Sequence, residues 1–363
     1  MRALSRRVLN RTLLERQLLA RRVSHTPLEA IEHLVAMQAQ MPNGPYVGLW
    51  ARLENFRLDD LTSLLKGRNV VHATMLRGTQ HLARSEDFGW LWPTVEPVVR
   101  SALAQPYYAA QIEGIDLDEL ARVGRRLLTG KTLHRRELGH LLVDRFPGRT
   151  PGRLAEAVEL LEALVHPPPH PTWGRWGHRS GTPVALADEW LGRPMVDAPQ
   201  PETMVLRYLA AFGPASVMDI QAWSGVTRLR EIIEGVRPRL RVFRDEHGGE
   251  LLDLPDAPLG EPDRPAPVRF LPAFDNAVLG HRDRTRVISE ENRRRIAPRA
   301  SAGVPLFLLD GFVEGSWTLT RDHLHIEPFR PLTDTETAAV RDEAAHLLRF
   351  VAPDNSEPAI TLT

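Results

Sequence analysis

The chain has 363 residues, with 46 Lys and Arg against 46 Asp and Glu, so its formal net charge is zero. This balance excludes a uniformly basic protein that coats DNA, but it leaves room for a local basic face. The chain has no cysteine, which excludes disulfides, thiolate zinc sites, iron–sulfur clusters and a cysteine nucleophile.

No targeting or membrane-spanning segment is visible in the sequence. The N-terminus is basic, but no apolar stretch of signal-peptide length follows it. No apolar run approaches the roughly 18 residues that a spanning helix needs. We therefore predict a cytoplasmic protein that does not contact a membrane.

The first hundred residues are predicted to be mainly helical. Thr26-Pro27-Leu28-Glu29 is a capping box with Pro at the first helical position, and apolar residues follow at helical spacing. The helix is expected to run to Gln38 or Gln40, because the Pro42-Asn43-Gly44-Pro45 segment cannot continue it.

A strand with a tight turn is predicted next. Residues 70–82 are rich in apolar residues, and Arg77-Gly78-Thr79 is the expected turn. Residues 1–100 carry a surplus of five positive charges, so this part is locally basic although the whole chain is neutral.

Two later segments show the pattern of a winged helix, which is two or three helices followed by a hairpin. In the first, three helices precede a segment rich in Pro, Gly and Trp at 166–177. In the second, three helices joined by Gly turns precede a hairpin around His247-Gly248-Gly249. The predicted helices are 117–128, 135–145, 153–165, 201–212, 217–224 and 228–236.

The C-terminal part is predicted to be a small sheet with a last helix. A Pro/Asp linker precedes strands at 268–271, 304–309 and 312–319, and Asp310-Gly311 is a hairpin signal. A capping box at Thr333-Asp334-Thr335-Glu336 opens a helix to about Phe350, and the tail after it is expected to be frayed.

These elements predict a helix-rich α+β fold of tandem winged-helix motifs with a small C-terminal antiparallel β-barrel or sheet. The expected domains are winged helices at 1–110, 111–198 and 199–256, followed by the barrel or sheet with its helix at 265–350.

The sequence lacks the motifs that mark the common enzyme classes. It has no Gly-x-Gly-x-x-Gly, no P-loop, no Gly-x-Ser-x-Gly and no His-Glu-x-x-His. His166 and His170 are four residues apart, but the three prolines between them forbid a helix, so we predict no metal site there. Helix-turn-helix patterns with arginines would, taken alone, indicate a DNA-binding regulator.

An ordered set of short motifs changes this interpretation. The motifs are Met37-Gln38-Ala39-Gln40-Met41-Pro42, Gly48-Leu49-Trp50-Ala51-Arg52, Leu76-Arg77-Gly78-Thr79-Gln80-His81-Leu82, Trp223-Ser224-Gly225, Phe270-Leu271-Pro272-Ala273-Phe274-Asp275-Asn276, Arg282-Asp283-Arg284 and Asp310-Gly311 to Trp317. Together, in this order, they resemble the winged-helix family of bacterial DNA glycosylases of the AlkZ and YcaQ type, over roughly residues 5–350.

The resemblance implies a function and a catalytic motif. Members of this family excise N7-alkylated guanine, including guanine in interstrand cross-links, and some protect antibiotic producers from their own DNA-alkylating product. The family motif is Gln, an apolar residue, then Gln or Asp, and it maps onto Gln38, Ala39 and Gln40. The second Gln matches the resistance-type members and not the Asp of the YcaQ type.

The chemistry needs neither a strong acid nor a strong base, and we predict no cofactor. Alkylation at N7 makes guanine cationic, so the base leaves as a neutral molecule without being protonated. The enzyme has to place a water below C1′ and stabilise the oxocarbenium charge. A Gln carbonyl oxygen can accept a hydrogen from that water and direct its dipole at the cation. The alternative is that Gln38 and Gln40 are solvated helix residues.

Several residues are candidates for DNA contact. Arg77 and His81 either touch phosphate or form the outer face of a strand. Arg282, Arg284 and Arg286 would form a cationic stripe if their segment is extended, and a solvated hairpin is the alternative.

Other motif residues have weaker assignments. Asp275 and Asn276 are expected to cap a turn, and a site role is the alternative. Arg293-Arg294-Arg295 is expected to be a solvated helix face. Trp173 and Trp176 are expected to pack in the core or in a hairpin, with contact to sugars as the alternative.

Three functions remain open from sequence. The first is a monofunctional glycosylase for bulky N7-alkylguanine in double-stranded DNA, acting as a monomer at an open cleft with little base flipping. The second is a transcription regulator, and the third is a DNA-damage binder without catalysis. Three winged-helix patterns in one chain together with Gln-Ala-Gln favour the first.

Overall fold

The computed structural model describes residues 3–174, 181–196, 198–320, 323–353 and 359–363. It is a mixed structure in which more residues are helical than extended, as the sequence predicted. One large cluster of buried apolar side chains extends through most of the described chain. Among the described residues, no helix is both long and apolar enough to cross a membrane.

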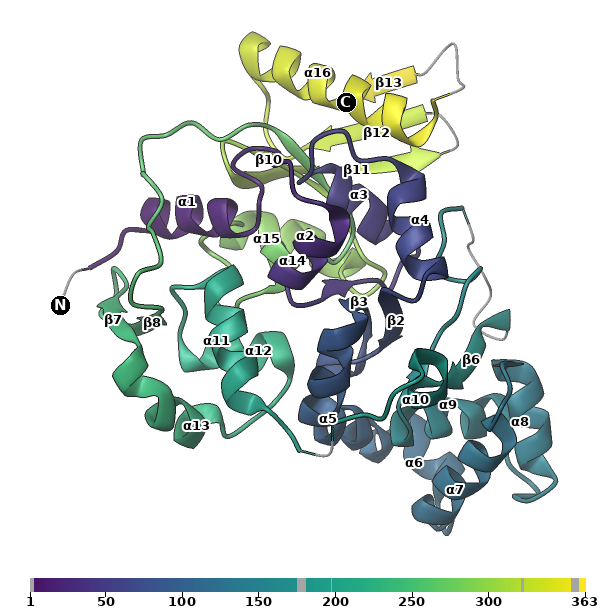
Figure 1. The fold of residues 1–363 in the computed structure, drawn as a ribbon. Coiled ribbons are helices and arrows are strands. Elements are labelled where there is room, and N and C mark those ends of the chain that lie inside the picture. The colour runs from purple at the N-terminus through teal and green to yellow at the C-terminus, as the bar shows by residue number, and fades with distance from the viewer. Residues whose placement is uncertain (1–2, 175–180, 197, 321–322, 354–358) are drawn as a thin grey trace.

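The N-terminal part is built around a three-stranded antiparallel sheet in the order β1-β3-β2 (Figure 1). Thr26 and Glu29 form the predicted capping box at the start of α2. The predicted strand at 70–82 is a hairpin, β2 and β3, joined by a short 3₁₀ turn. The elements are α1 (Arg6–Arg16), α2 (Pro27–His33), β1 (Met37–Gln38), α3 (Gly44–Trp50), α4 (Leu58–Lys66), β2 (Val70–Thr74), η1 (Leu76–Gly78), β3 (Gln80–Arg84) and α5 (Ser85–Ser101).

The next part is a group of helices with a second small sheet, at the lower right of Figure 1. Its strand order is β4-β6-β5, with both pairings antiparallel. The strands β5 and β6 flank the segment that was predicted as a Gly/Trp hairpin. The elements are α6 (Pro106–Ile112), α7 (Leu117–Leu128), β4 (Leu133–His134), α8 (Arg135–Val143), α9 (Pro151–Leu161), β5 (Leu164–Val165), β6 (Pro183–Leu186) and α10 (Ala187–Leu191).

The third part follows the predicted order of three helices and a hairpin. A capping box of Ser216 and Asp219 opens α12, and Gly225 ends this helix in the left-handed conformation, which glycine adopts without steric cost. The elements are α11 (Pro201–Phe212), α12 (Val217–Ser224), α13 (Leu229–Val236), β7 (Arg241–Arg244) and β8 (Glu250–Asp253).

The C-terminal part is an open five-stranded sheet in the order β13-β12-β11-β10-β9. The described strands do not close into a barrel, so of the two predicted forms the sheet is correct, but it is antiparallel only over β9 to β12, because β12 and β13 are parallel. The tail that was expected to fray contains β13, which pairs parallel with β12. The elements are β9 (Arg269–Leu271), α14 (Asn276–Leu279), α15 (Glu290–Ile296), β10 (Leu306–Leu309), β11 (Phe312–Thr320), β12 (His323–Pro328), α16 (Asp334–Val351) and β13 (Ala359–Leu362).

The helix α1 ties the N-terminus to the third part of the chain. The backbone N–H of Leu4 donates to the carbonyl of Arg244, at 2.8 Å. Arg16 forms a buried ion pair with Asp253, with 2.7 Å between the nearest atoms. Asn10 also reaches the C-terminal part, because its amide donates to the carbonyl of Gly311 at 2.8 Å. The N-terminal segment therefore packs against the third part and the C-terminal part, both of which are distant from it in sequence.

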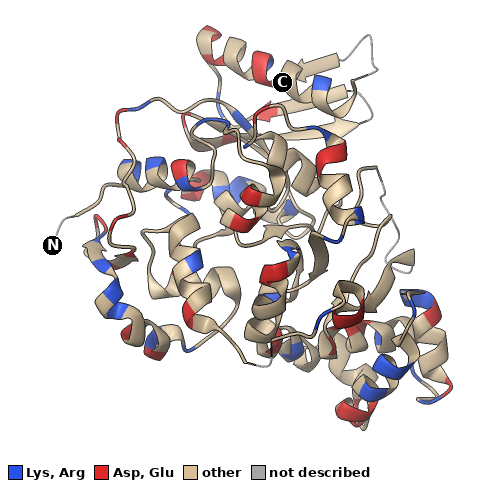
Figure 2. Ribbon diagram, viewed as in Figure 1, with Lys and Arg blue, Asp and Glu red and all other residues tan. Residues whose placement is uncertain are grey.

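Charged residues are distributed over all parts of the molecule (Figure 2). Arg, Lys, Asp and Glu lie interspersed on most helices, in keeping with the neutral total. Positive charge available for a ligand therefore has to be identified residue by residue, from arginines that no carboxylate neutralises.

Candidate active site

The Gln-Ala-Gln motif lies on an edge strand and not at the end of a helix. The helix α2 ends at His33, and Val35 adopts a left-handed backbone with φ of 67°. The chain then pairs with β3, with Gln38 opposite His81. The predicted helix to Gln38 or Gln40 is therefore wrong. A left-handed residue stops helical hydrogen bonding, and pairing with β3 satisfies the backbone beyond it.

The extended backbone explains the spacing of the two glutamines. Alternate side chains of an extended segment point to the same side, so Gln38 and Gln40 share a side and Ala39 faces the other way. Ala39 is 2% exposed and packs in the core, where a small side chain fits. Both glutamines line one cavity of about 620 Å³. The other lining residues are Met41, Pro42, Gly78, Thr79, Gln80, His170, Thr182, Phe274, Ser301 and Ala302.

The backbone of the motif is anchored from two sides. The N–H of Ala39 donates to the carbonyl of Gln80 at 2.8 Å, which continues the pairing with β3. The side chain of Asn276 accepts from the N–H of Gln38 at 3.4 Å and donates to the carbonyl of Ala36 at 2.5 Å. Asn276 therefore contacts the backbone of the motif directly, and a role for this residue in the site stays a prediction.

The neighbour of Asn276 holds a buried ion pair. The two carboxylate oxygens of Asp275 accept from the two terminal nitrogens of Arg52, each at 2.8 Å. Asp275 also caps α14 by accepting from the N–H of Ala277 at 2.9 Å. This pair fixes the loop that presents Asn276 to the motif. The expectation that Asp275 caps a turn is confirmed.

The side chain of Gln38 is held by Arg77. A terminal nitrogen of Arg77 donates to the Gln38 amide oxygen at 2.6 Å, and the other donates to the carbonyl of Trp223. A carbonyl oxygen has two lone pairs, so the Gln38 oxygen keeps one acceptor position for a water in the cavity. Arg77 is therefore a candidate for positioning the catalytic amide as well as for DNA contact.

Arg77 is a half-buried cation without an acidic partner among the described residues. No carboxylate of a described residue lies within ion-pair distance of it, whereas Arg22, Arg52 and Arg135 each have one. Burial, and then the nearby charge of Arg284, lower the pKa of Arg77 to about 10, so it stays positive at neutral pH. Two arginines close together and not neutralised favour an anionic ligand such as a phosphate.

His81 does not supply positive charge to this site. It is 0% exposed, and its Nδ1 donates to the carbonyl of Thr79 at 2.9 Å. Burial, followed by the charge of Arg77, lowers the pKa of His81 to about 3. The ring is neutral at physiological pH, so the prediction that His81 binds phosphate is not supported by its position.

The buried neutral ring of His81 has a consequence for stability. An unfolded chain protonates this ring below its ordinary pKa of 6.5, whereas the folded chain does so only near pH 3. Folding stability from this group is therefore present above pH 6.5 and is lost as the pH falls from 6.5 toward 3, by about 1 kcal/mol per pH unit. Urea unfolding at a series of pH values should show a shallower acid slope for His81→Gln. Equal slopes would contradict the assignment.

The three alternating arginines do not form a continuous stripe. Their segment contains a turn, in which the N–H of Val287 donates to the carbonyl of Arg284 at 2.9 Å. Arg282 is exposed and Arg284 is half-buried. Arg286 is 5% exposed and donates to the carbonyl of Pro214 at 2.9 Å, so it serves the interior. Of the three, Arg282 and Arg284 have no carboxylate partner among the described residues and can meet a ligand.

The remaining candidates have structural partners. Arg293 pairs with Glu290 and Arg295 with Glu291 along one helix, which agrees with a solvated helix face. Trp173 packs edge-on against Tyr46, with 5.5 Å between the ring centroids. Trp176 lies outside the described residues.

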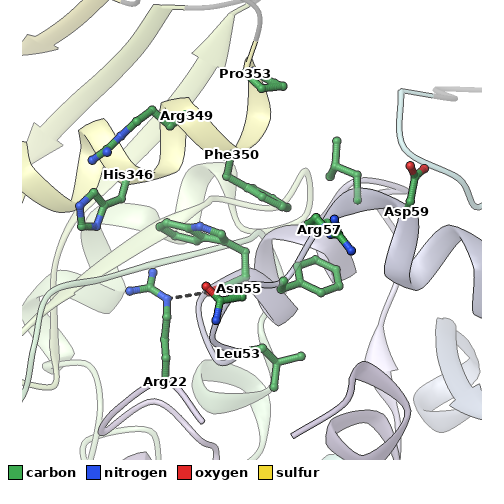
Figure 3. Close-up of a pocket in the computed structure, with 12 residues that line it drawn as sticks. Arg22, Leu53, Asn55, Arg57, Asp59, His346, Arg349, Phe350 and Pro353 are labelled. Atoms are coloured by element: carbon green, nitrogen blue, oxygen red, sulfur yellow. Dashed lines mark hydrogen bonds between the residues drawn. The ribbon is translucent and has the colours of Figure 1, made fainter. Parts of the chain in front are cut away.

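A second cavity, of about 680 Å³, lies away from the motif. Figure 3 shows Phe350 at this cavity, together with Arg22, Arg57 and Arg349. Trp50 also lines the cavity and stacks on Phe350, with 5.9 Å between the ring centroids. None of the site residues predicted from sequence lines this cavity, so the candidate active site is the cavity of the two glutamines.

Sequence reasoning missed a buried polar cluster behind the motif. It consists of His72, Glu159 and His166, all less than 9% exposed. His166 was considered only as a metal ligand, and His72 lies in a run of apolar strand residues. A histidine at an interior strand position was the one available signal. No group of three or more ligand-type residues in the described chain is arranged to hold a metal ion.

Comparison with known proteins places the chain in a class. The model of the family described as DNA glycosylase AlkZ-like matches residues 31–350, so the chain belongs to the AlkZ-like DNA glycosylase family. A relative in Streptomyces sahachiroi, an interstrand DNA cross-link repair glycosylase, is 27% identical over 174 residues. The match covers 44% of this chain and 45% of that relative, so the chain matches about half the length of this relative.

The fold agrees with a solved structure of the same family. The structure of Streptomyces sahachiroi DNA glycosylase AlkZ matches with a TM-score of 0.81 over 100% of both chains, at 21% sequence identity. At this identity the likeness concerns the fold. The family resemblance inferred from the ordered motifs is confirmed by the match to the family model.

Proposed function

We propose that this protein is a monofunctional DNA glycosylase that hydrolyses the N-glycosidic bond of bulky N7-alkylguanine in duplex DNA. The observation that carries the proposal is the placement of Gln38 and Gln40 on one side of an extended segment, both lining a single cavity. The adjacent cations Arg77 and Arg284 support it, because they provide a place for the backbone phosphate of the lesion strand.

The two glutamines would place and orient the attacking water. Gln38 has its amide oxygen fixed by Arg77 and keeps one lone pair for the water. The oxygen of Gln40 accepts from the N–H of Gln80 at 3.3 Å, which holds its side chain along the cavity wall. Amide oxygens fixed in this way stabilise the oxocarbenium charge without needing to reorganise during the reaction.

The finer assignments belong to the same proposal. The matched relative is named for interstrand cross-link repair, and we propose cross-linked guanine among the substrates, in the setting of resistance to a DNA-alkylating natural product. We propose that the parts at 1–110, 111–198 and 199–256 act as winged helices against the duplex, with the sheet and helix at 265–350 completing the DNA-binding surface. A monomer in the cytoplasm stays a prediction.

The decisive experiment is base release from a duplex that carries a defined N7-alkylguanine. Purified protein should release the modified base in EDTA, because the sequence offers no cysteine and no helical pair of histidines as metal ligands. Dependence on added zinc or magnesium would contradict the mechanism, and failure on every N7 adduct tried would contradict the function. A sequence-specific footprint on undamaged DNA without base release would instead indicate a regulator.

Two arginines are expected to bind phosphates with a measurable effect. The double variant Arg282→Ala/Arg284→Ala should reduce the slope of log affinity against log salt by about 0.9 for each phosphate that the variant no longer binds. Arg286→Ala is the matched control, because this side chain is buried and bonds a backbone carbonyl. It should lower thermal stability and leave the salt slope unchanged. A double variant with the parent's slope would assign both arginines to a solvated loop.

A further inference from the structure

A chain of buried polar groups ends on the carbonyl between the two glutamines. His72 Nε2 lies 3.1 Å from the oxygen of Ala39, and His72 Nδ1 lies 3.0 Å from Nδ1 of His166. His166 Nε2 lies 2.8 Å from a carboxylate oxygen of Glu159. The other oxygen of Glu159 accepts from Arg135 at 2.5 Å. The two histidines and the glutamate come from β2, from the end of β5 and from α9, so three elements converge on the motif.

The donors and acceptors in this chain assign its protons. The Ala39 oxygen can only accept, so His72 Nε2 donates to it. Burial, followed by the charge of His166, holds the pKa of His72 well below its ordinary value, so its ring is neutral and its Nδ1 is an acceptor. His166 Nδ1 therefore donates to His72.

The other end of the chain assigns the second proton of His166. Attraction to Arg135 and to His166 outweighs burial and keeps the pKa of Glu159 well below its ordinary value, so the carboxylate is ionised and only accepts. His166 Nε2 therefore donates to Glu159, and His166 carries a proton on both ring nitrogens. In this arrangement both ring nitrogens of His166 are hydrogen-bond donors, one to His72 and one to Glu159.

A third histidine and a hydroxyl group complete the surroundings of His166. His170 faces both rings, with 5.7 Å to the centroid of His72 and 6.0 Å to that of His166. Burial, and next the charge of His166, lower the pKa of His170 to about 4. Glu159 also accepts from the hydroxyl of Thr74 at 2.9 Å, so its carboxylate has hydrogen bonds to Thr74, Arg135 and His166.

We propose that this series of hydrogen-bonded side chains positions the motif for the reaction. In it, the doubly protonated ring of His166 fixes the Nε2–H tautomer of His72. His72 thereby fixes the orientation of the peptide that carries Gln38 and Gln40. The inference rests on the proposed function. Neither His72 nor His166 lines the cavity. Burying three titratable groups costs free energy that an apolar core would not. Because the hydrogen-bonded series ends on the carbonyl of Ala39 in the motif, positioning of the motif explains why the fold keeps these buried polar groups.

The test compares two substitutions of His72. His72→Gln keeps a donor and an acceptor at about the spacing of Nε2 and Nδ1, whereas His72→Phe keeps the ring and removes both. A displaced catalytic group can cost on the order of 100-fold in rate. We therefore expect His72→Phe to lower the single-turnover excision rate by at least about tenfold. Affinity for the damaged duplex should stay near that of the parent, and His72→Gln should recover most of the rate.

His33→Phe is the matched control, because His33 also bonds a backbone carbonyl, that of Arg16, and does not line the cavity of the two glutamines. This variant should excise at the parent's rate. If His72→Phe does not fold, Glu159→Gln removes the carboxylate charge at constant shape and should lower the rate in the same way. A His72→Phe or Glu159→Gln variant that excises at the parent's rate would overturn the proposal.

A measurement that does not depend on activity tests the proton assignment. In protein with ¹⁵N-labelled histidine, NMR at neutral pH should show both ring nitrogens of His166 protonated and only Nε2 of His72 protonated. A His166→Asn variant assigns the signals. A neutral His166 ring would overturn the inference even if the enzyme is active. A parent protein that releases no base would instead refute the proposed function. The NMR result would then still decide which ring nitrogens of His72 and His166 carry protons.

Discussion

Gln38→Ala is expected to lower the single-turnover rate of base excision by about 30- to 1,000-fold, which corresponds to about 2–4 kcal/mol of transition-state stabilisation. The side chain donates no hydrogen bond to the described protein, and its oxygen is fixed by Arg77 at 2.6 Å. Its loss removes a preoriented dipole from the cavity and leaves the strand β1 intact. Folding and affinity for damaged duplex should therefore remain close to those of the parent.

Two substitutions of Gln40 sharpen this result. Gln40→Ala should impair excision. Gln40→Asp should stay active with a changed preference among lesions, because Asp keeps an acceptor oxygen, adds negative charge near the oxocarbenium and occurs there in YcaQ-type motifs. Gln105→Ala, at an exposed position away from the cavity, is the matched control. If Gln38→Ala and Gln40→Ala both excise at the parent's rate, the pair is structural.

Asp275→Ala is expected to reduce the free energy of unfolding by about 3–5 kcal/mol, because it leaves the charge of Arg52 buried without a partner. The side chains of this pair are 0% and 2% exposed, and they form two hydrogen bonds of 2.8 Å. Arg52 cannot turn to solvent, since it also donates to the carbonyls of Gln17 and Gly48, each at 2.9 Å. Urea unfolding of both proteins measures the difference.

The matched control is an ion pair at the surface. Glu250→Ala breaks a pair with Arg237 in which the side chains are 39% and 33% exposed, and it should cost no more than about 1 kcal/mol. Asp275→Ala should also slow excision, because it loosens the loop through which Asn276 contacts the backbone of Gln38. An Asp275→Ala protein as stable as the parent would show that Arg52 finds solvent or another partner.

Features that depend on neighbouring residues could be predicted from the sequence. The capping boxes predicted at Thr26 and Thr333 form between side chains and N–H groups three residues apart, so their chemistry is complete within one turn. The Asp310-Gly311 hairpin is equally local, with both residues at positive φ. The ordered motifs, including Gln-Ala-Gln, were also sufficient to identify the family.

The way these pieces form a site depends on tertiary packing. The end of α2 at His33 depends on pairing between β1 and β3, which a helical pattern in the sequence does not show. The hydrogen bond of Arg77 to Gln38 spans 39 residues, and that of His72 to His166 spans 94. Arg286 is buried and donates to a backbone carbonyl, so it does not meet a ligand. Burial also lowers the pKa of His81, which keeps its ring neutral. The physical reason is that hydrogen-bond partners, burial and charge neighbours at such separations are set by packing between elements, which no short stretch of sequence contains.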